Sequence, residues 1–353
     1  MTTATDSQIP DTLHNPVLET YFADPFCFYH DGTYYAVGTG KDEADACPIT
    51  GNVVPMIKST NLQHWHRVGH VLPQPKDEIG GHFWAPEIAT DGKRFFMYYH
   101  PNGTRGLKFH IRCAIADNPE GPYIDTGTPL TDLAKNPFAI DAHAFRDDDG
   151  QWYMYYATDF LDMSSATTPP TFRGTALVVD RMKSLTELEG NPRVVMRPHW
   201  PWQLFKRDRD MYGKIADWYT LEGPTVLKRN NKYYLFFSGG CYENDTYGVD
   251  YLTADHPLGP WTEHGKHNGP QVVRTIPSPP NQILGPGHNS IVASPGGGDG
   301  TDYFVYHAWN KQFTERQLWI DPIEWTPDGP QVARFAPYIH EKNALASRAE
   351  SKL

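Results

Sequence analysis

The sequence contains few of the features that tie a small fold together, cross a membrane or bind nucleic acid. Its 353 residues include only four cysteines, which form no Cys-x-x-Cys pair and no zinc-ligand spacing, so we expect buried thiols. No run of about 18 apolar residues occurs, so no membrane-spanning segment is predicted. Lys and Arg number 31 against 42 Asp and Glu, without a basic run, which argues against a nucleic-acid partner.

A secretory signal is also missing from the N-terminal segment. Residues 1–11 are polar and lack the apolar core that signal peptides contain. Together with the absence of a cysteine framework, this predicts a cytoplasmic protein. No pattern in the sequence specifies an oligomeric state.

The chain does contain one motif that occurs five times. Each copy has an acidic or small residue, a short apolar run, a turn of Asp, Asn or Gly, and an aromatic strand. The copies open at Asp24, Ala85, Asp141, Glu222 and Gly287, at intervals of roughly 60 to 80 residues. Alternating runs and Pro/Gly/Asn turns complete each unit. This pattern predicts an all-β fold, a five-bladed β-propeller with about four antiparallel strands per blade.

The five units occupy nearly the whole chain. We therefore expect one domain over residues 15–340, with tails at 1–14 and 341–353. Only Arg181–Glu189 has the character of a short helix. An insertion, Leu161–Tyr219, lengthens the third unit, and on a repeat scaffold such an insertion is usually a loop on the functional face.

Three carboxylates open three of the repeats. Asp24, Asp141 and Glu222 fall at the start of the innermost strand of the first, third and fourth units, where a radial fold brings equivalent positions together. Clustered, buried carboxylates cost free energy, because desolvation and like charges both oppose ionisation. Paired carboxylates are typical of glycoside hydrolysis, in which one protonates the leaving oxygen and the other activates water or attacks the sugar.

With these motifs the chain resembles glycoside hydrolase family 43. The segments that carry the resemblance are Ala23-Asp24-Pro25, Trp84-Ala85-Pro86-Glu87, Ile140-Asp141, Leu221-Glu222-Gly223-Pro224 and Gly285-Pro286-Gly287-His288-Asn289-Ser290. They occur one per unit, in the family's order, between about Asn15 and Pro330. The resemblance implies a five-bladed propeller that acts on arabinose- and xylose-containing glycans.

The resemblance also implies roles for the three carboxylates. Asp24 would be the general base that activates water, and Glu222 the general acid. Asp141 would raise the pKa of the acid and orient it. The family inverts the anomeric configuration, so the base and the acid are expected roughly 6.5–9.5 Å apart.

Further residues are assigned by the same resemblance. His288 would lie in the axial channel beside a calcium ion, bound through water because imidazole is a poor direct ligand for a hard cation; the alternative is a histidine that contacts the carboxylates without metal. Arg316 would reach the sugar pocket. Trp84 and Phe26 would wall it, with core packing as the alternative for each. Glu87 is expected to form a buried hydrogen bond rather than to transfer protons.

These expectations combine into one function. The chain is predicted to be an inverting exo-α-L-arabinofuranosidase that acts on plant-polysaccharide oligosaccharides, with no organic cofactor. β-Xylosidase and arabinanase are the alternatives on the same scaffold; a C-terminal β-sandwich typical of many family β-xylosidases is not present in the sequence. An alternative of another class is a non-catalytic carbohydrate-binding propeller. A retaining enzyme acting on fructosides would need Asn-Asp-Pro where this chain has Ala23-Asp24-Pro25.

Overall fold

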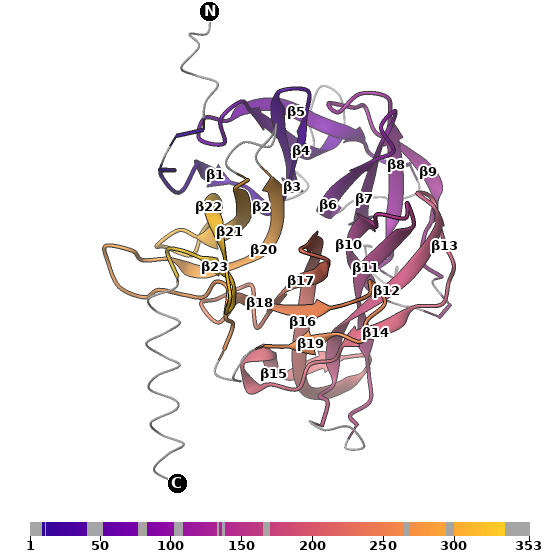
Figure 1. The fold of residues 1–353 in the computed structure, drawn as a ribbon. Helices are drawn as coiled ribbons and strands as arrows, with labels where there is room; N and C mark the ends of the chain where they lie inside the picture. The colour runs from indigo at the N-terminus through magenta and orange to yellow at the C-terminus, as the bar shows by residue number, and fades with distance from the viewer. Residues whose placement is uncertain are drawn as a thin grey trace, which may run out of the picture.

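The computed structural model describes most of the chain, and its described residues are predominantly β-strands (Figure 1). The described ranges are 9–10, 12–40, 52–76, 83–101, 109–132, 134–135, 138–164, 170–264, 269–293 and 300–335. Within them the prediction of an all-β fold is confirmed. The same ranges contain no helix with the length and apolar character that a membrane span requires.

The strands pair into five antiparallel units. The first two are β2 (Ala23–His30), β3 (Thr33–Thr39), β4 (Asn52–Ser59) and β5 (His66–Pro73), then β6 (Phe83–Thr90), β7 (Phe95–Pro101), β8 (Arg112–Ala116) and β9 (Ile124–Pro129). The third is β10 (Ala139–Arg146), β11 (Trp152–Phe160) and β12 (Gly174–Ser184), on which β13 (Glu187–Leu188) and β14 (Arg193–Met196) also pair.

The remaining units contain an added strand each. The fourth is β16 (Lys214–Arg229), β17 (Lys232–Gly239), β18 (Gly248–Ala254) and β19 (Thr262–Glu263), with β15 (Leu204–Met211) paired to β16. A short 3-10 helix, η3 (Pro201–Gln203), precedes β15. The fifth is β20 (Leu284–Ala293), β21 (Asp302–Trp309), β22 (Arg316–Thr326) and β23 (Gly329–Val332), and β1 (Leu18–Tyr21) pairs with β22.

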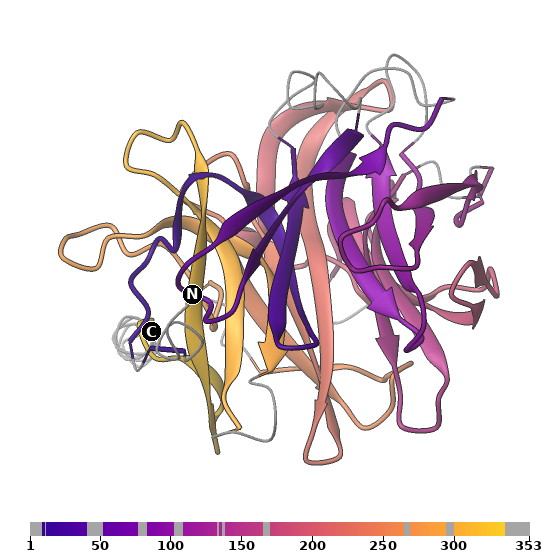
Figure 2. The ribbon, with the colours of Figure 1, turned by 90° about the horizontal axis from the view of Figure 1, so that it is seen from above.

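The units follow one another around a common centre. Their first strands contact each other in the order β2, β6, β10, β16 and β20, and β20 contacts β2. A short parallel pairing of β12 with β16 joins the third and fourth units. In it, Gly174 lies opposite Tyr219 and Thr175 lies opposite Thr220. Viewed from above, strands of different units run side by side (Figure 2). The first strands of all five units therefore meet at the middle of the molecule.

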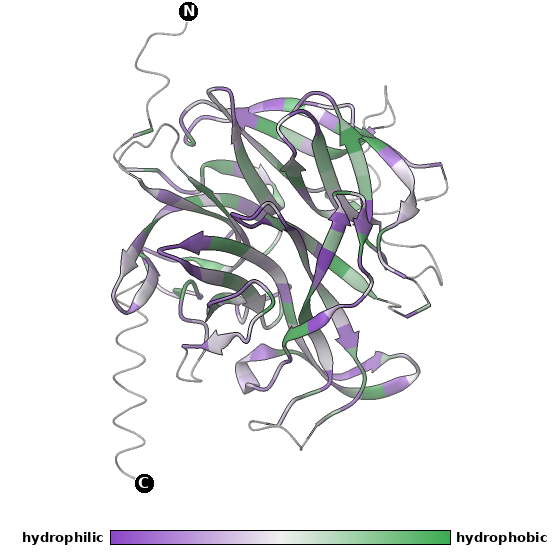
Figure 3. Ribbon diagram, turned by 45° about the vertical axis from the view of Figure 1, so that its right-hand side comes forward, coloured by the Kyte–Doolittle hydropathy of each residue, from purple (hydrophilic) through white to green (hydrophobic). Residues whose placement is uncertain are grey.

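Turn chemistry and side-chain alternation explain why these segments form hairpins. The two-residue turn between β2 and β3 is Asp31-Gly32, and both residues have positive φ, 44° and 80°, as a type I′ hairpin turn requires. Hydrophobic residues gather on the strands and hydrophilic ones on the turns (Figure 3). This distribution buries the strands between neighbouring units.

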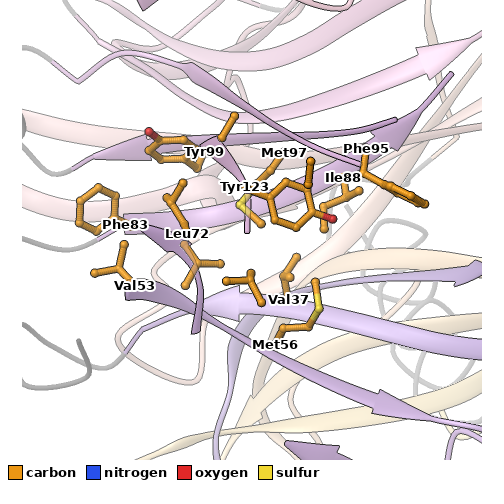
Figure 4. Packing of buried hydrophobic residues seen from close by; sticks show 14 of the residues in the cluster. Val37, Val53, Met56, Leu72, Phe83, Ile88, Phe95, Met97, Tyr99 and Tyr123 are labelled. Carbon is orange, nitrogen blue, oxygen red and sulfur yellow. The ribbon is translucent and has the colours of Figure 1, made fainter. Parts of the chain in front are cut away.

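The core lies between the units rather than in one central layer. In one cluster, Val37 and Met56 of the first unit face Ile88 and Met97 of the second, and all four are at most 6% exposed (Figure 4). Close-packed aliphatic and aromatic contacts of this kind fix the angle between two sheets. The strand ends that open each unit are thereby held in place.

Two features differ from the sequence expectations. The segment Arg181–Glu189 is not a helix: Met182 pairs with Leu188 across a tight turn, and Ser184 Oγ accepts the Thr186 N–H inside it. The N-terminal β1 belongs to the last unit, since it pairs with β22. Leu13, within the predicted tail 1–14, is buried at 7% exposure. The outer limits of the domain otherwise stay predictions, and 341–353 lie outside the described residues.

Candidate active site

The first strand of each unit carries the same local distortion. Each has a shift of register about two residues wide that contains one residue with positive φ, and β20 has a second such shift at Gly285 (φ 51°). Those residues are Asp24 (50°), Ala85 (41°), Asp141 (56°), Gly223 (56°) and His288 (48°). A bulge of this kind redirects a side chain out of the regular alternation, and non-glycine residues rarely adopt it. The five bulges therefore direct the first residues of the five units toward the centre of the molecule.

The bulges correct one sequence expectation. The structurally equivalent positions are Asp24, Asp141 and His288, whereas Glu222 comes one residue before the equivalent position, Gly223. At Gly223 an added Cβ would lie 3.3 Å from the imidazole of His288, so the turn leaves little room for a side chain. The fourth unit thus presents its carboxylate from the preceding position.

The five openings surround a cavity of about 820 Å³. Six of the seven residues predicted for the site line it: Asp24, Trp84, Asp141, Glu222, His288 and Arg316. All three carboxylates, from three different units, therefore share one pocket.

Phe26 is the exception, and its assignment to the pocket wall is wrong. It is not among the residues that line the cavity, and it packs against the core cluster between the first and second units. Its ring stacks on Phe28, with centroids 6.4 Å apart. The bulge at Asp24 turns the carboxylate toward the pocket, while Phe26, paired with Val37, returns to the regular strand face.

Asp24 is held by Arg316 and His307 from the fifth unit and by Thr39 from its own unit. Arg316 Nη1 lies 2.9 Å from Asp24 Oδ1, and the Thr39 hydroxyl donates to Asp24 Oδ2 at 2.6 Å. His307 Nδ1 lies 3.3 Å from Oδ1 and accepts the backbone N–H of Asp24 at 3.1 Å. Burial by itself raises the pKa of the Asp24 carboxyl, but the Arg316 charge, together with His288 and His307, outweighs it and holds the pKa well below 3.8. Asp24 is therefore ionised at neutral pH.

The pKa values of Asp141 and Glu222 are raised, in contrast to that of Asp24. Burial raises the pKa of Glu222 to about 7, although the Tyr247 hydroxyl donates to Oε1 at 2.7 Å and opposes the shift. Burial, and then the charges of Glu222 and Asp24, raise the pKa of Asp141 well above its usual value. Because the two carboxyls interact, they titrate as a pair. This pair retains a proton at neutral pH, beside an ionised Asp24.

His288 lies between the carboxylates. Its Nδ1 is 3.5 Å from Asp24 Oδ1 and 4.0 Å from Asp141 Oδ2, and burial lowers the pKa of its imidazole. Among the described residues, no group of three or more His, Cys, Asp or Glu side chains is arranged as metal ligands. A calcium ion bound through water beside His288 stays a prediction.

Two further family residues have the surroundings expected of them. Glu87 is buried, and its Oε2 lies 2.7 Å from His143 Nδ1, which confirms the predicted hydrogen bond. Trp84 lines the cavity with its ring edge-on to His100, with centroids 5.6 Å apart, and near Phe109 at 5.6 Å. Its indole is thus held at the pocket wall by neighbouring rings.

Four other residues at the site were missed at the sequence level. Tyr247, which directly precedes β18, donates to Glu222, and His307 of β21 contacts Asp24. Phe205 and Arg209 line the cavity from β15, inside the insertion Leu161–Tyr219. The expectation that the insertion is a loop is corrected, since its described part contains strands that reach the pocket. No sequence signal marked these residues, because none lies in the short motifs that open the repeats.

Comparison with known proteins gives consistent matches. A family model described as Glycosyl hydrolases family 43 matches residues 13–330. The chain is 28% identical over 312 residues to the β-D-galactofuranosidase xynD of Aspergillus niger, covering 83% of this chain and 75% of that protein. It is 25% identical over 338 residues to an extracellular exo-α-(1→5)-L-arabinofuranosidase of Streptomyces avermitilis, covering 90% and 62%. A solved structure of a thermostable family-43 glycoside hydrolase aligns with TM-score 0.72 and 29% identity, over 91% of this chain and 96% of that one.

The names of the relatives correct the cytoplasmic prediction. The Streptomyces avermitilis protein and three further relatives are named extracellular. The described cysteines Cys27, Cys113 and Cys241 are buried and unpaired. A buried thiol is shielded from oxidation, so free cysteines of this kind do not identify a reducing compartment.

Proposed function

Because the chain belongs to glycosyl hydrolase family 43, we propose that it is an inverting exo-α-L-arabinofuranosidase built on a five-bladed β-propeller. The closed order of contacts among β2, β6, β10, β16 and β20 supports the propeller. The family places its activity on glycosidic bonds; the sugar, the stereochemistry and the residue roles are parts of the proposal.

The observation that carries the proposal is the opposite ionisation of carboxyls in one pocket. Asp24 is held ionised by Arg316, and the pKa of Glu222 is raised to about 7 by burial. A base and an acid with well-separated pKa values are what hydrolysis of a glycosidic bond requires.

In the proposed reaction, Asp24 accepts a proton from water as the water attacks the anomeric carbon. Glu222 gives its proton to the leaving oxygen, so the departing sugar leaves as a neutral alcohol. Arg316 keeps Asp24 ionised. Asp141 and Glu222 titrate as a coupled pair, and this pair retains the proton that Glu222 donates. Attack and departure on opposite faces invert the configuration.

The names of the relatives favour a five-membered sugar ring. One relative is named for D-galactofuranose and another for L-arabinofuranose. β-D-Galactofuranosides and α-L-arabinofuranosides have the same configuration around the ring and differ in the group at C4. A pocket for one ring therefore admits the other if there is space beyond C4, which makes β-D-galactofuranoside the second candidate substrate; a further relative is named a β-xylosidase.

A substrate panel tests the sugar. Initial rates should be compared on 4-nitrophenyl α-L-arabinofuranoside, β-D-galactofuranoside and β-D-xyloside, followed by proton NMR of the first-formed anomer. We expect the arabinofuranoside to be hydrolysed fastest, with inversion. Faster release from the xyloside would overturn the choice of sugar, and a retained anomer would overturn the roles of Asp24 and Glu222.

A non-catalytic carbohydrate-binding propeller is the competing proposal. It predicts sugar binding, measurable by calorimetry, without product release from arabino- or xylo-oligosaccharides. The opposed pKa shifts of Asp24 and Glu222 argue for catalysis, because a binding protein has no use for a stored proton beside an ionised carboxylate.

The Asp141→Asn variant tests the carboxyl pair. The charges of Asp141 and Glu222 oppose each other's ionisation, so removing the Asp141 carboxyl should lower the pH at which the pair gives up its last proton. Since activity requires protonated Glu222, the alkaline limb of kcat/KM against pH should move to lower pH. Asn keeps an oxygen that can accept the Gly223 N–H, which Asp141 Oδ2 accepts at 3.0 Å. An alkaline limb that stays in place would contradict the coupling.

A further inference from the structure

Strand β15 and the turn that joins it to β16 form one wall of the pocket and lie outside the repeated motif. Strand β15 pairs with β16, the strand that also carries Glu222. Four residues of β15 and the turn after it line the cavity: Phe205, Arg209, Met211 and Tyr212. The hairpin is tied to the third unit, because the Tyr212 hydroxyl donates to Asp159 Oδ2 at 2.7 Å. It is therefore a fixed wall on the side of the proposed general acid.

A distortion in β15 separates two neighbouring arginines. The register of β15 shifts between Lys206 and Arg209, and Asp208 inside the shift has φ of 48°. Arg207 consequently faces solvent, where its Nη1 pairs with Asp217 Oδ2 at 2.8 Å. Arg209 is partly buried and lines the cavity.

The Arg209 guanidinium is positioned by rings and not by a carboxylate. It lies over Phe205, 4.4 Å from the ring centroid, and Phe205 is 6.0 Å from the ring of Tyr242. Arg316, which binds Asp24, also lies over the ring of Tyr242, 5.1 Å from its centroid. Unlike Arg316, Arg209 forms no ion pair with any described residue. Stacking fixes its plane and leaves its N–H donors available to a ligand.

The position of Arg209 indicates what that ligand is. The general acid donates its proton to the leaving oxygen, so the leaving sugar must lie beside Glu222. Arg209 is near enough to Glu222 for its charge to favour the ionised carboxylate. A guanidinium there faces the hydroxyl groups of the departing sugar.

We propose that Arg209, presented by the β15–β16 hairpin, binds the hydroxyl groups of the leaving sugar and so selects glycan over simple aryl leaving groups. The proposal rests on the proposed function, since it takes Glu222 as the general acid. Arg209 is a positioning residue that acts on the leaving group from the wall beside Glu222.

The test is the Arg209→Met variant, assayed on an α-1,5-linked arabino-oligosaccharide and on 4-nitrophenyl α-L-arabinofuranoside. A lost charged hydrogen bond should lower kcat/KM on the oligosaccharide by roughly 10- to 100-fold. The aryl substrate lacks sugar hydroxyls on its leaving group, so its kcat/KM should change by less than about threefold. The alkaline limb should also move to higher pH, because the cation that favours ionised Glu222 is gone.

Two further variants separate this role from a structural one. Arg207→Met removes an arginine from the same strand outside the pocket and should leave both substrates unaffected. Arg209→Lys keeps the charge but loses the planar donor set, so the pH limb should stay while the oligosaccharide preference falls. Equal losses on both substrates, or no loss on the oligosaccharide, would overturn the proposal. Wild-type protein that hydrolyses neither substrate would instead overturn the proposed function.

Discussion

Replacing Glu222 by Gln is expected to lower kcat/KM on arabino-oligosaccharides by about 10²- to 10⁴-fold, the usual contribution of a general acid. Gln has nearly the shape of Glu but no proton to give to the leaving oxygen. The loss should be smaller on 2,4-dinitrophenyl arabinofuranoside, whose leaving group departs without protonation. The alkaline limb of the pH profile should disappear, because it reports the carboxyl whose pKa is raised to about 7.

The control for this variant is Glu324→Gln, on the exposed face of β22. It removes the same charge far from any described pocket residue and should leave both substrates and the alkaline limb unchanged. If Glu222→Gln lowers activity on the dinitrophenyl and oligosaccharide substrates by the same factor, Glu222 is not the proton donor.

The Asp24→Asn variant is expected to lower kcat by about 10²- to 10⁴-fold on every substrate, activated or not. Without this carboxylate no base accepts the proton of the attacking water, and a better leaving group does not compensate. In the wild type, the acid limb should lie below about pH 4, since the pKa of Asp24 is held well below 3.8. Steady-state rates with arabinofuranosides of graded leaving groups measure the first effect, and a pH profile the second.

Stability must be separated from catalysis in this variant. Asp24→Asn leaves the guanidinium of Arg316 buried without its carboxylate, which should cost about 3 kcal/mol of the free energy of unfolding. In the double variant Asp24→Asn/Arg316→Met no charge is left unpaired, so stability should recover while activity stays lost. Asp31→Asn, in the exposed turn that follows β2, is the matched control and should change neither. Recovery of activity along with stability would show that Asp24 acts only through folding.

The sequence by itself determined the local structure and the kinds of chemical group. The Asp31-Gly32 turn and the aromatic strand after it are set by backbone preferences of two to eight residues, so they are visible in the chain. The carboxylates Asp24, Asp141 and Glu222 were identified because each opens a repeat. Their common pocket was expected from the repetition, and the cavity contains all three.

Only the tertiary structure decided which way side chains face where a strand is irregular. A bulge inserts one residue and so changes which side chains face each side of the strand. For this reason Phe26 faces the core, and the fourth unit presents Glu222, the residue before Gly223, to the pocket. The same effect separates Arg207 from Arg209 in β15. Local sequence does not reveal such a shift, because both alternations have similar composition.

The protonation states were likewise decided by partners distant in the chain. Asp24 owes its low pKa to Arg316, which lies in the last unit, and the pKa of Glu222 is raised by burial that only the assembled units provide. The sequence thus determined which residues carry the chemistry, because residue type and local turn conformation depend only on short segments of the chain. The fold decided which carboxyl is the base and which holds the proton, because desolvation and Coulomb interactions depend on distances between segments that only folding brings together.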